Sequence, residues 1–168
     1  SSGSYGCTHY PNIKCDGKQS SEKNGRYISK LTAYDKIAKN EYLIGRKIRK
    51  LQKQSENSET DENETLILVE KKCKVSKRRV KKITNKYQDC NKIVKKKRSK
   101  QYVLLFSKYF ESVTATNYIG NDTCFPRIFR VYFFGIETAD YLYQEKRVVH
   151  MDLHFNNIIY DTKDKFHM

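Results

Sequence analysis

The side chains best suited to chemistry gather near the C-terminal end, between His150 and Asn157. Asp152 supplies a carboxylate that can orient a hydroxyl or accept its proton, and Asn157 supplies an amide oxygen that can bind a divalent cation. A His-x-Asp sequence alone occurs often by chance. Here the whole string His-Met-Asp-Leu-His-Phe-Asn-Asn stands between a stretch with helical spacing over 127–145 and a short apolar run over 158–160. This setting predicts a loop between a helix and a β-hairpin.

The string resembles the catalytic loop of protein kinases, H-R-D-L-x-x-x-N, with His, Asp, Leu and Asn at the required spacing. The resemblance implies phosphoryl transfer, in which the protein mainly positions groups and neutralises charge. Asp152 would accept or orient the substrate hydroxyl, Asn157 would hold Mg²⁺, and His150 would brace the loop. Met151 replaces the usual Arg, so regulation through a phosphorylated activation loop is not implied. His154 replaces a Lys, as in small-molecule kinases of the aminoglycoside and choline type, which leaves both acceptor classes open.

A kinase also needs a glycine-rich loop, a strand lysine and a helical glutamate upstream, in that order. Residues 1–8, Ser-Ser-Gly-Ser-Tyr-Gly-Cys-Thr, resemble the second half of the glycine-rich loop. Glycine lets a backbone approach phosphates closely. The residues that the resemblance places against ATP are Gly3, Ser4, Tyr5 and Gly6.

The sequence Tyr-Ile-Ser-Lys ending at Lys30 resembles the V-A-I-K strand of kinases and implies that Lys30 binds the α- and β-phosphates. Apolar spacing predicts a helix over 33–53, with an apolar stripe formed by Ile37, Tyr42, Leu43, Ile44, Ile48 and Leu51. Glu41 falls on the first half of this helix, and the resemblance implies that it pairs with Lys30. The hinge whose backbone reaches adenine is expected at Leu105, Phe106 and Lys108.

Short strings near the N-terminus, Gly-Ser-Tyr-Gly-Cys and Cys-Asp-Gly before Tyr-Ile-Ser-Lys-Leu, look like the divergent serine/threonine kinases of large DNA viruses. The resemblance covers most of the chain outside 55–100. It implies an α+β, two-lobed kinase-like fold, with an N-lobe of antiparallel strands and helix C over 1–106 and a partial helical C-lobe over 107–168. Further strands are expected at 26–31, 65–69 and 101–106.

ATP and Mg²⁺ are the cofactors that the resemblance implies, and a protein carrying a Ser or Thr hydroxyl is the implied substrate. The retained Asp152, Asn157 and Lys30 argue against a pseudokinase. The D-F-G aspartate, which also holds Mg²⁺, would be due just after Met168. We therefore expect no phosphoryl transfer from these 168 residues by themselves.

The net charge of +15 is concentrated in one part of the chain. Fifteen of the 34 Lys and Arg fall within 71–100, where Asp89 is the one acidic residue. We interpret 55–100 as an acidic loop followed by a basic, partly ordered insertion. Such a segment can neutralise nucleic-acid phosphates, so a nucleic-acid-binding module is an alternative function, although Tyr87 is the one aromatic ring there for base stacking.

Five cysteines are scattered along the chain without a Cys-x-x-Cys pair, and the four histidines show no zinc spacing with them. This pattern favours free thiols in a reducing compartment, which predicts a cytoplasmic, intracellular protein. The resemblance to viral kinases implies a host cell or a virion as its setting. No apolar run reaches the length of a membrane span, so no membrane partner is expected.

Overall fold

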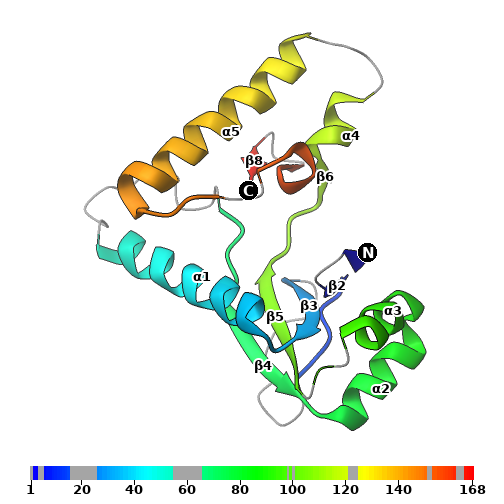
Figure 1. Cartoon of the computed structure of the whole chain (residues 1–168). Helices are drawn as coiled ribbons and strands as arrows, with labels where there is room; N and C mark the ends of the chain where they lie inside the picture. The colour runs from blue at the N-terminus through cyan, green and yellow to red at the C-terminus, as the bar shows by residue number, and fades with distance from the viewer. Residues whose placement is uncertain are drawn as a thin grey trace. The chain divides into compact units, whose positions relative to one another are not determined.

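A computed structural model describes residues 2–3, 6–15, 26–54, 66–97, 99, 101–120, 125–150, 153–161 and 165–168. The chain forms two compact units, one of Ser1–Arg49 with Leu68–Tyr109 and the other of Lys50–Ile67 with Phe110–Met168. Each unit combines helices with an antiparallel sheet, so the α+β class that the sequence predicts is present (Figure 1). The second unit includes 50–67, although the kinase resemblance places this range in the N-terminal lobe.

The first unit is built on an antiparallel sheet whose strands lie in the order β1-β2-β3-β5-β4 (Figure 1). The strands are β1 (Ser2–Gly3), β2 (Gly6–His9), β3 (Tyr27–Ala33), β4 (Lys71–Val75) and β5 (Tyr102–Lys108). β5 pairs with β3 on one side and β4 on the other, and its residues from Tyr102 to Phe106 are all buried. Covered faces explain the continuous apolar sequence of this strand, which extends two residues beyond the predicted 101–106.

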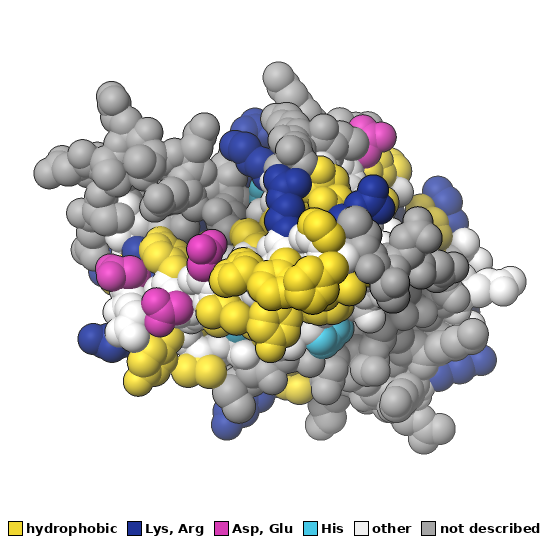
Figure 2. All heavy atoms as spheres, turned by 90° about the horizontal axis from the view of Figure 1, so that it is seen from above, with side chains coloured by type: hydrophobic (Ala, Val, Ile, Leu, Met, Phe, Trp, Pro, Cys, Tyr) yellow, Lys and Arg dark blue, Asp and Glu magenta, His cyan; other side chains and the backbone are white. Residues whose placement is uncertain are grey.

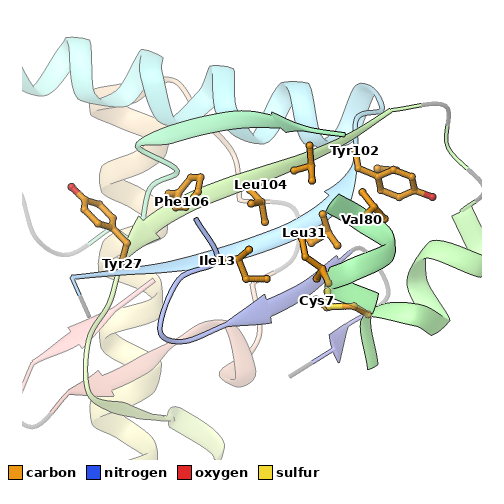
Figure 3. Packing of buried hydrophobic residues seen from close by; sticks show 12 residues of the cluster. Cys7, Ile13, Tyr27, Leu31, Val80, Tyr102, Leu104 and Phe106 are labelled. Carbon is orange, nitrogen blue, oxygen red and sulfur yellow. A yellow bond between two sulfur atoms is a disulfide. The ribbon is translucent and has the colours of Figure 1, made fainter. Parts of the chain in front are cut away.

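One face of this sheet packs against α2 (Lys77–Lys86) and α3 (Gln88–Lys97). Leu31 and Leu104 from the sheet share a buried cluster with Val80, Ile83 and Cys90 from the two helices (Figure 3). The expectation of a partly ordered insertion over 71–100 is therefore wrong. A few apolar residues at helical spacing suffice to hold the helices, because the sheet offers them a large apolar surface.

The opposite face of the sheet packs against α1 (Lys36–Gln54). Ala38 of α1 shares a second buried cluster with Val69, Val103 and Leu105. The predicted helix is present, and Ile48 of its predicted apolar stripe is buried, whereas Ile37, Leu43 and Ile44 of that stripe are exposed. The other buried positions among the described residues of α1 are Ala38, Gly45 and Gln52.

Residues 66–70 do not form the strand that was expected at 65–69, and β4 begins only at Lys71. The carbonyls of Val69 and Glu70 accept hydrogen bonds from the Arg49 guanidinium of α1, at 2.6 and 3.2 Å. A β-carbon on Gly45 would lie 2.8 Å from the Val69 carbonyl oxygen. The Glu70 backbone N–H donates to the Phe106 carbonyl at 2.7 Å, so this segment joins β5 only at the end that leads into β4.

Four of the cysteines form two disulfides, Cys7–Cys90 and Cys15–Cys73, which overturns the expectation of free thiols. Their Cα atoms are 5.3 and 6.1 Å apart, within the usual range for a disulfide. The partners are 83 and 58 residues apart in the sequence, so no local spacing could reveal them.

The second unit contains the antiparallel sheet β6-β7-β8 with the helices α4 and α5. Its elements are β6 (Ser112–Thr114), α4 (Ala115–Ile119), α5 (Phe125–Lys146), the 3₁₀ turn η2 (Phe155–Asn157), β7 (Ile159–Asp161) and β8 (Phe166–His167). The helix, loop and hairpin order that the sequence predicts at this end is present. β6 and α4 lie within 107–168, the part of the chain that the resemblance assigns to the C-lobe.

Helix α5 buries Val131, Gly135, Thr138 and Leu142 on one side. Several large hydrophobic side chains of α5 are exposed, and Figure 2 shows hydrophobic side chains gathered on the face of the molecule that it views. The exposed ones on α5 are Phe125, Phe129, Tyr132, Phe133, Ile136 and Tyr143. Among the helices of the described residues, none combines the length and the apolar character that spanning a membrane requires.

Candidate functional site

The clearest polar contact of the first unit joins Lys30 of β3 to Glu41 of α1. The Lys30 Nζ lies 3.0 Å from Oε1 and 2.9 Å from Oε2 of Glu41. Both side chains are about one-third exposed, at 31% and 33%. The ammonium therefore keeps solvent access while a carboxylate fixes its position.

The backbone explains why these two side chains meet. Lys30 is directly opposite Leu105 in the sheet, and Leu105 packs with Ala38 of α1, so Lys30 points toward the α1 side. Glu41 follows Ala38 by three residues and precedes Gly45 by four, which places it on the buried face of the helix. The helix begins beside this point, where the Asp35 carboxylate accepts a hydrogen bond from the Ala38 backbone N–H at 3.0 Å.

Gly6, at the start of β2, lies against the same lysine. A β-carbon on Gly6 would lie 2.9 Å from the Leu31 carbonyl oxygen and 3.0 Å from Cγ of Lys30. Gly3 of β1 is paired with Gly6 across the hairpin. The absence of a side chain at Gly6 leaves room for the aliphatic part of Lys30 to lie beside the hairpin.

The predicted catalytic loop lies in the second unit and is described on both sides of Asp152. Asp152 itself, with Met151, lies outside the described residues. His154 caps the η2 turn, since its Nδ1 accepts a hydrogen bond from the Asn156 backbone N–H at 3.2 Å. The Asn157 backbone N–H donates to the His154 carbonyl at 2.8 Å. His154 thus shapes the turn that carries Asn157.

The loop is held to the elements around it within the second unit. Thr116 Oγ1 of α4 donates to Asn156 Oδ1 at 2.7 Å, and the Ala115 backbone N–H donates to the Ile158 carbonyl at 2.8 Å. On α5, a β-carbon at Gly135 would lie 3.4 Å from Cδ1 of Ile158. The Asn157 turn is therefore supported by two helices and by the hairpin that follows it.

A second support lies in the hairpin itself, where two ionisable side chains are buried together. Asp161 Oδ2 is 2.8 Å from His167 Nε2, and their side chains are only 5% and 2% exposed. Asp161 Oδ1 also accepts a hydrogen bond from the Lys165 backbone N–H at 3.1 Å. The pair closes β7 onto β8 directly after the predicted catalytic loop.

The structure brings together three residues that the sequence places in one site, namely Gly6, Lys30 and Glu41. Asn157 belongs to the other unit, and Ser4, Tyr5 and Asp152 lie outside the described residues. The residues expected at the hinge, Leu105, Phe106 and Lys108, lie in the C-terminal half of β5. Leu105 and Phe106 pair with β3 and with β4, and Lys108 is the last residue of the strand, opposite Tyr27. Their backbone groups serve the sheet, and the chain leaves this unit after Tyr109.

Sequence reasoning missed one group of possible metal ligands. Among the described residues, Cys7, His9 and Cys90 offer a nitrogen and two sulfur atoms that all lie within 4.8 Å of one another. The Cys-x-His spacing on one strand is the only local signal, and the third member is far away in the sequence.

Comparison of the chain with protein-family models, with curated proteins and with solved structures found no match. Any functional conclusion therefore depends on the residues and contacts described above.

Proposed function

We propose that the protein is an ATP-dependent kinase that transfers phosphate to Ser or Thr hydroxyls of proteins. The observation that carries this proposal is the contact of Lys30 with both carboxylate oxygens of Glu41, beside the Gly3–Gly6 hairpin. In protein kinases, a strand lysine held by a helical glutamate and a glycine-rich loop together bind the phosphates of ATP. Three features that the motif resemblance requires thus meet in one place.

The contact of Lys30 with Glu41 has the geometry that phosphate binding requires. Triphosphate binding needs a cation at a fixed position, and a lysine side chain has many rotamers unless another group orients it. Glu41 orients the ammonium through two oxygens, and one-third exposure leaves Lys30 open to a solvent-borne ligand. Gly6 lets the backbone of the hairpin lie close to the lysine stem. In this proposal the hairpin and Lys30 bind the phosphates of Mg²⁺·ATP.

The reacting hydroxyl would be handled by the loop from His150 to Asn157. Asp152 would orient the hydroxyl and accept its proton, and the Asn157 amide oxygen would bind Mg²⁺. The support for these roles is the motif, with the described frame of α5, η2 and the β7–β8 hairpin around it. His154 has a structural part as the cap of the η2 turn, which accounts for its presence without a contact to phosphate.

The first test is equilibrium binding of Mg²⁺·ATP to the chain, measured by titration calorimetry. Lys30→Ala should weaken binding about tenfold or more, because a charge-assisted contact to phosphate is lost. Lys74→Ala, an exposed lysine on β4, is the matched control and should leave the affinity unchanged. Equal affinities for the wild type and Lys30→Ala would contradict the proposal.

The second test concerns the reaction and uses the protein expressed from its full gene. Phosphate transfer from γ-labelled ATP to a mixture of proteins should be abolished by Asp152→Asn. Transfer only to small alcohols such as choline or aminoglycosides would instead establish the small-molecule kinase alternative. Turnover that survives Asp152→Asn would overturn the assignment of the catalytic aspartate.

A second candidate function, binding of nucleic acid, is favoured by the outer face of α2. Its buried side carries Val80, Ile83 and Thr84. Its exposed basic residues are Lys77, Arg78, Lys81, Lys82 and Lys86. A cationic helix face of this kind attracts a phosphate backbone without base specificity.

Salt dependence distinguishes this candidate from kinase activity. Affinity for single-stranded RNA should fall steeply with salt concentration, and Arg78→Ala with Lys81→Ala and Lys82→Ala should flatten the slope by about 2 units. The same triple variant should bind Mg²⁺·ATP normally. A salt-independent affinity, or a slope that the triple variant leaves unchanged, would exclude α2 as a nucleic-acid site.

A further inference from the structure

Cys7, His9 and Cys90 form a compact set of soft ligand atoms away from the Lys30–Glu41 contact. Cys7 and His9 are two residues apart on β2 and so point to the same side of the strand. Cys90 reaches them from α3, and His9 Nε2 lies 2.8 Å from its sulfur. The two cysteines are almost fully buried, at 1% and 0% exposure. The ring of His9 also packs against Tyr87, with centroids 4.2 Å apart.

We propose that Cys7, His9 and Cys90 bind a zinc ion when the Cys7–Cys90 disulfide is reduced. Two thiolates and one imidazole are a donor set that zinc prefers, and three protein ligands leave a fourth position for a water molecule. Cys7 and Cys90 therefore form a disulfide under oxidising conditions and bind a zinc ion under reducing conditions.

The chemistry balances with reagents found in reducing compartments. Two molecules of a small thiol such as glutathione break the S–S bond, protonate both sulfurs and become a disulfide themselves. Zn²⁺ then displaces the two thiol protons to solvent and binds both thiolates. His9 adds the lone pair of Nε2, with its own proton on Nδ1.

The geometry requires only local movement. Zinc binds sulfur at about 2.3 Å and nitrogen at about 2.0 Å, so a tetrahedral ion would hold the two sulfurs roughly 3.8 Å apart. The Cα atoms of Cys7 and Cys90 are 5.3 Å apart, and side-chain rotation can open the sulfurs to that spacing. His9 already directs Nε2 toward the Cys90 sulfur.

Either state of the site joins β2 to α3. A disulfide does not persist in the cytosol, where thiol buffers keep cysteines reduced. A zinc ion with the same ligands would keep α3 attached to the sheet under those conditions. The proposal does not depend on kinase activity, because Cys7 and Cys90 lie in the buried cluster on the α2–α3 face of the sheet, whereas Lys30 points toward α1.

The test uses the full chain with Cys15→Ser and Cys73→Ser, so that the Cys7–Cys90 pair is the only described disulfide. After reduction, this protein should bind one equivalent of Zn²⁺, measured by elemental analysis after gel filtration. Co²⁺ in place of Zn²⁺ should give a thiolate-to-cobalt charge-transfer band and tetrahedral d–d bands. The oxidised protein should bind neither metal.

Further substitutions identify the ligands. Cys90→Ser should abolish the charge-transfer band, and His9→Gln should weaken Co²⁺ affinity by roughly tenfold or more, as expected when one ligand is lost. The reduced wild-type chain provides a check that needs no substitution, because added Zn²⁺ should raise its melting temperature with increasing concentration. A reduced wild type that gains neither a charge-transfer band nor thermal stability overturns the proposal. So does Co²⁺ binding that His9→Gln leaves unchanged.

Discussion

Lys30 of β3 and Glu41 of α1, only 11 residues apart in the sequence, meet with the lysine Nζ within 3.0 Å of both carboxylate oxygens. The contact lies entirely within the first unit. The sheet register directs Lys30 toward α1, and the buried face of α1 carries Glu41 back to it. The position of the ammonium is therefore set by the packing of one helix on one sheet.

Glu41→Gln should weaken ATP binding while leaving the free energy of unfolding nearly unchanged. A pair that is one-third exposed contributes about 1 kcal/mol or less to the free energy of unfolding, so urea denaturation should change little. The amide still accepts a hydrogen bond but no longer carries charge, and we expect Mg²⁺·ATP affinity to fall about fivefold. Glu137→Gln, on an exposed position of α5, is the control. Unchanged ATP affinity in Glu41→Gln would show that orientation of Lys30 is unimportant.

Gly6→Ala should disturb both the hairpin and the lysine beside it. The added β-carbon would lie 2.9 Å from the Leu31 carbonyl oxygen, a backbone atom that cannot turn away. We expect a loss of about 1–3 kcal/mol in the free energy of unfolding and weaker binding of Mg²⁺·ATP. Urea denaturation and calorimetric titration measure the two effects. A Gly6→Ala protein with wild-type stability would show that the hairpin lies farther from β3.

Two helical glycines should respond oppositely to alanine. At Gly45 a β-carbon would lie 2.8 Å from the Val69 carbonyl oxygen, whereas at Gly135 the closest atom is a side-chain methyl at 3.4 Å. Alanine favours a helix over glycine by about 1 kcal/mol. Gly135→Ala should therefore be neutral or stabilising, and Gly45→Ala should destabilise the protein by about 1–3 kcal/mol. Thermal unfolding of both variants tests the close approach of α1 to the 66–70 segment.

Removal of the Cys15–Cys73 disulfide should destabilise the first unit under oxidising conditions. The bond spans 58 residues of sequence, so its loss frees a long loop in the unfolded chain and should cost about 2–4 kcal/mol. Chemical denaturation of Cys15→Ser with Cys73→Ser, compared with the wild type without reductant, measures the difference. A midpoint that stays in place would mean that these cysteines are not bonded in the folded protein.

The sequence by itself determined the elements with strong local signals. The continuous apolar run from Tyr102 indicated β5, because both faces of that strand are covered. The alternation of side chains around Lys30 indicated β3. The helix before the predicted catalytic loop and the hairpin after it were also predicted correctly from the sequence. The kinase resemblance also implied the contact of Lys30 with Glu41, which is present in the structure.

Tertiary structure decided which faces of the helices are buried and which cysteines meet. Ile37 and Leu43 of α1 are exposed, because the helix contacts the rest of the unit through Ala38, which packs against β5, and Gly45, which lies close to the Val69 backbone. Arg49 adds hydrogen bonds to the Val69 and Glu70 carbonyls. The basic segment has few apolar residues, so α2 and α3 depend for their stability on packing against the sheet and on the Cys7–Cys90 disulfide. Contacts such as Cys7 with Cys90 depend on the path of the chain over 83 residues, and no local pattern encodes that path.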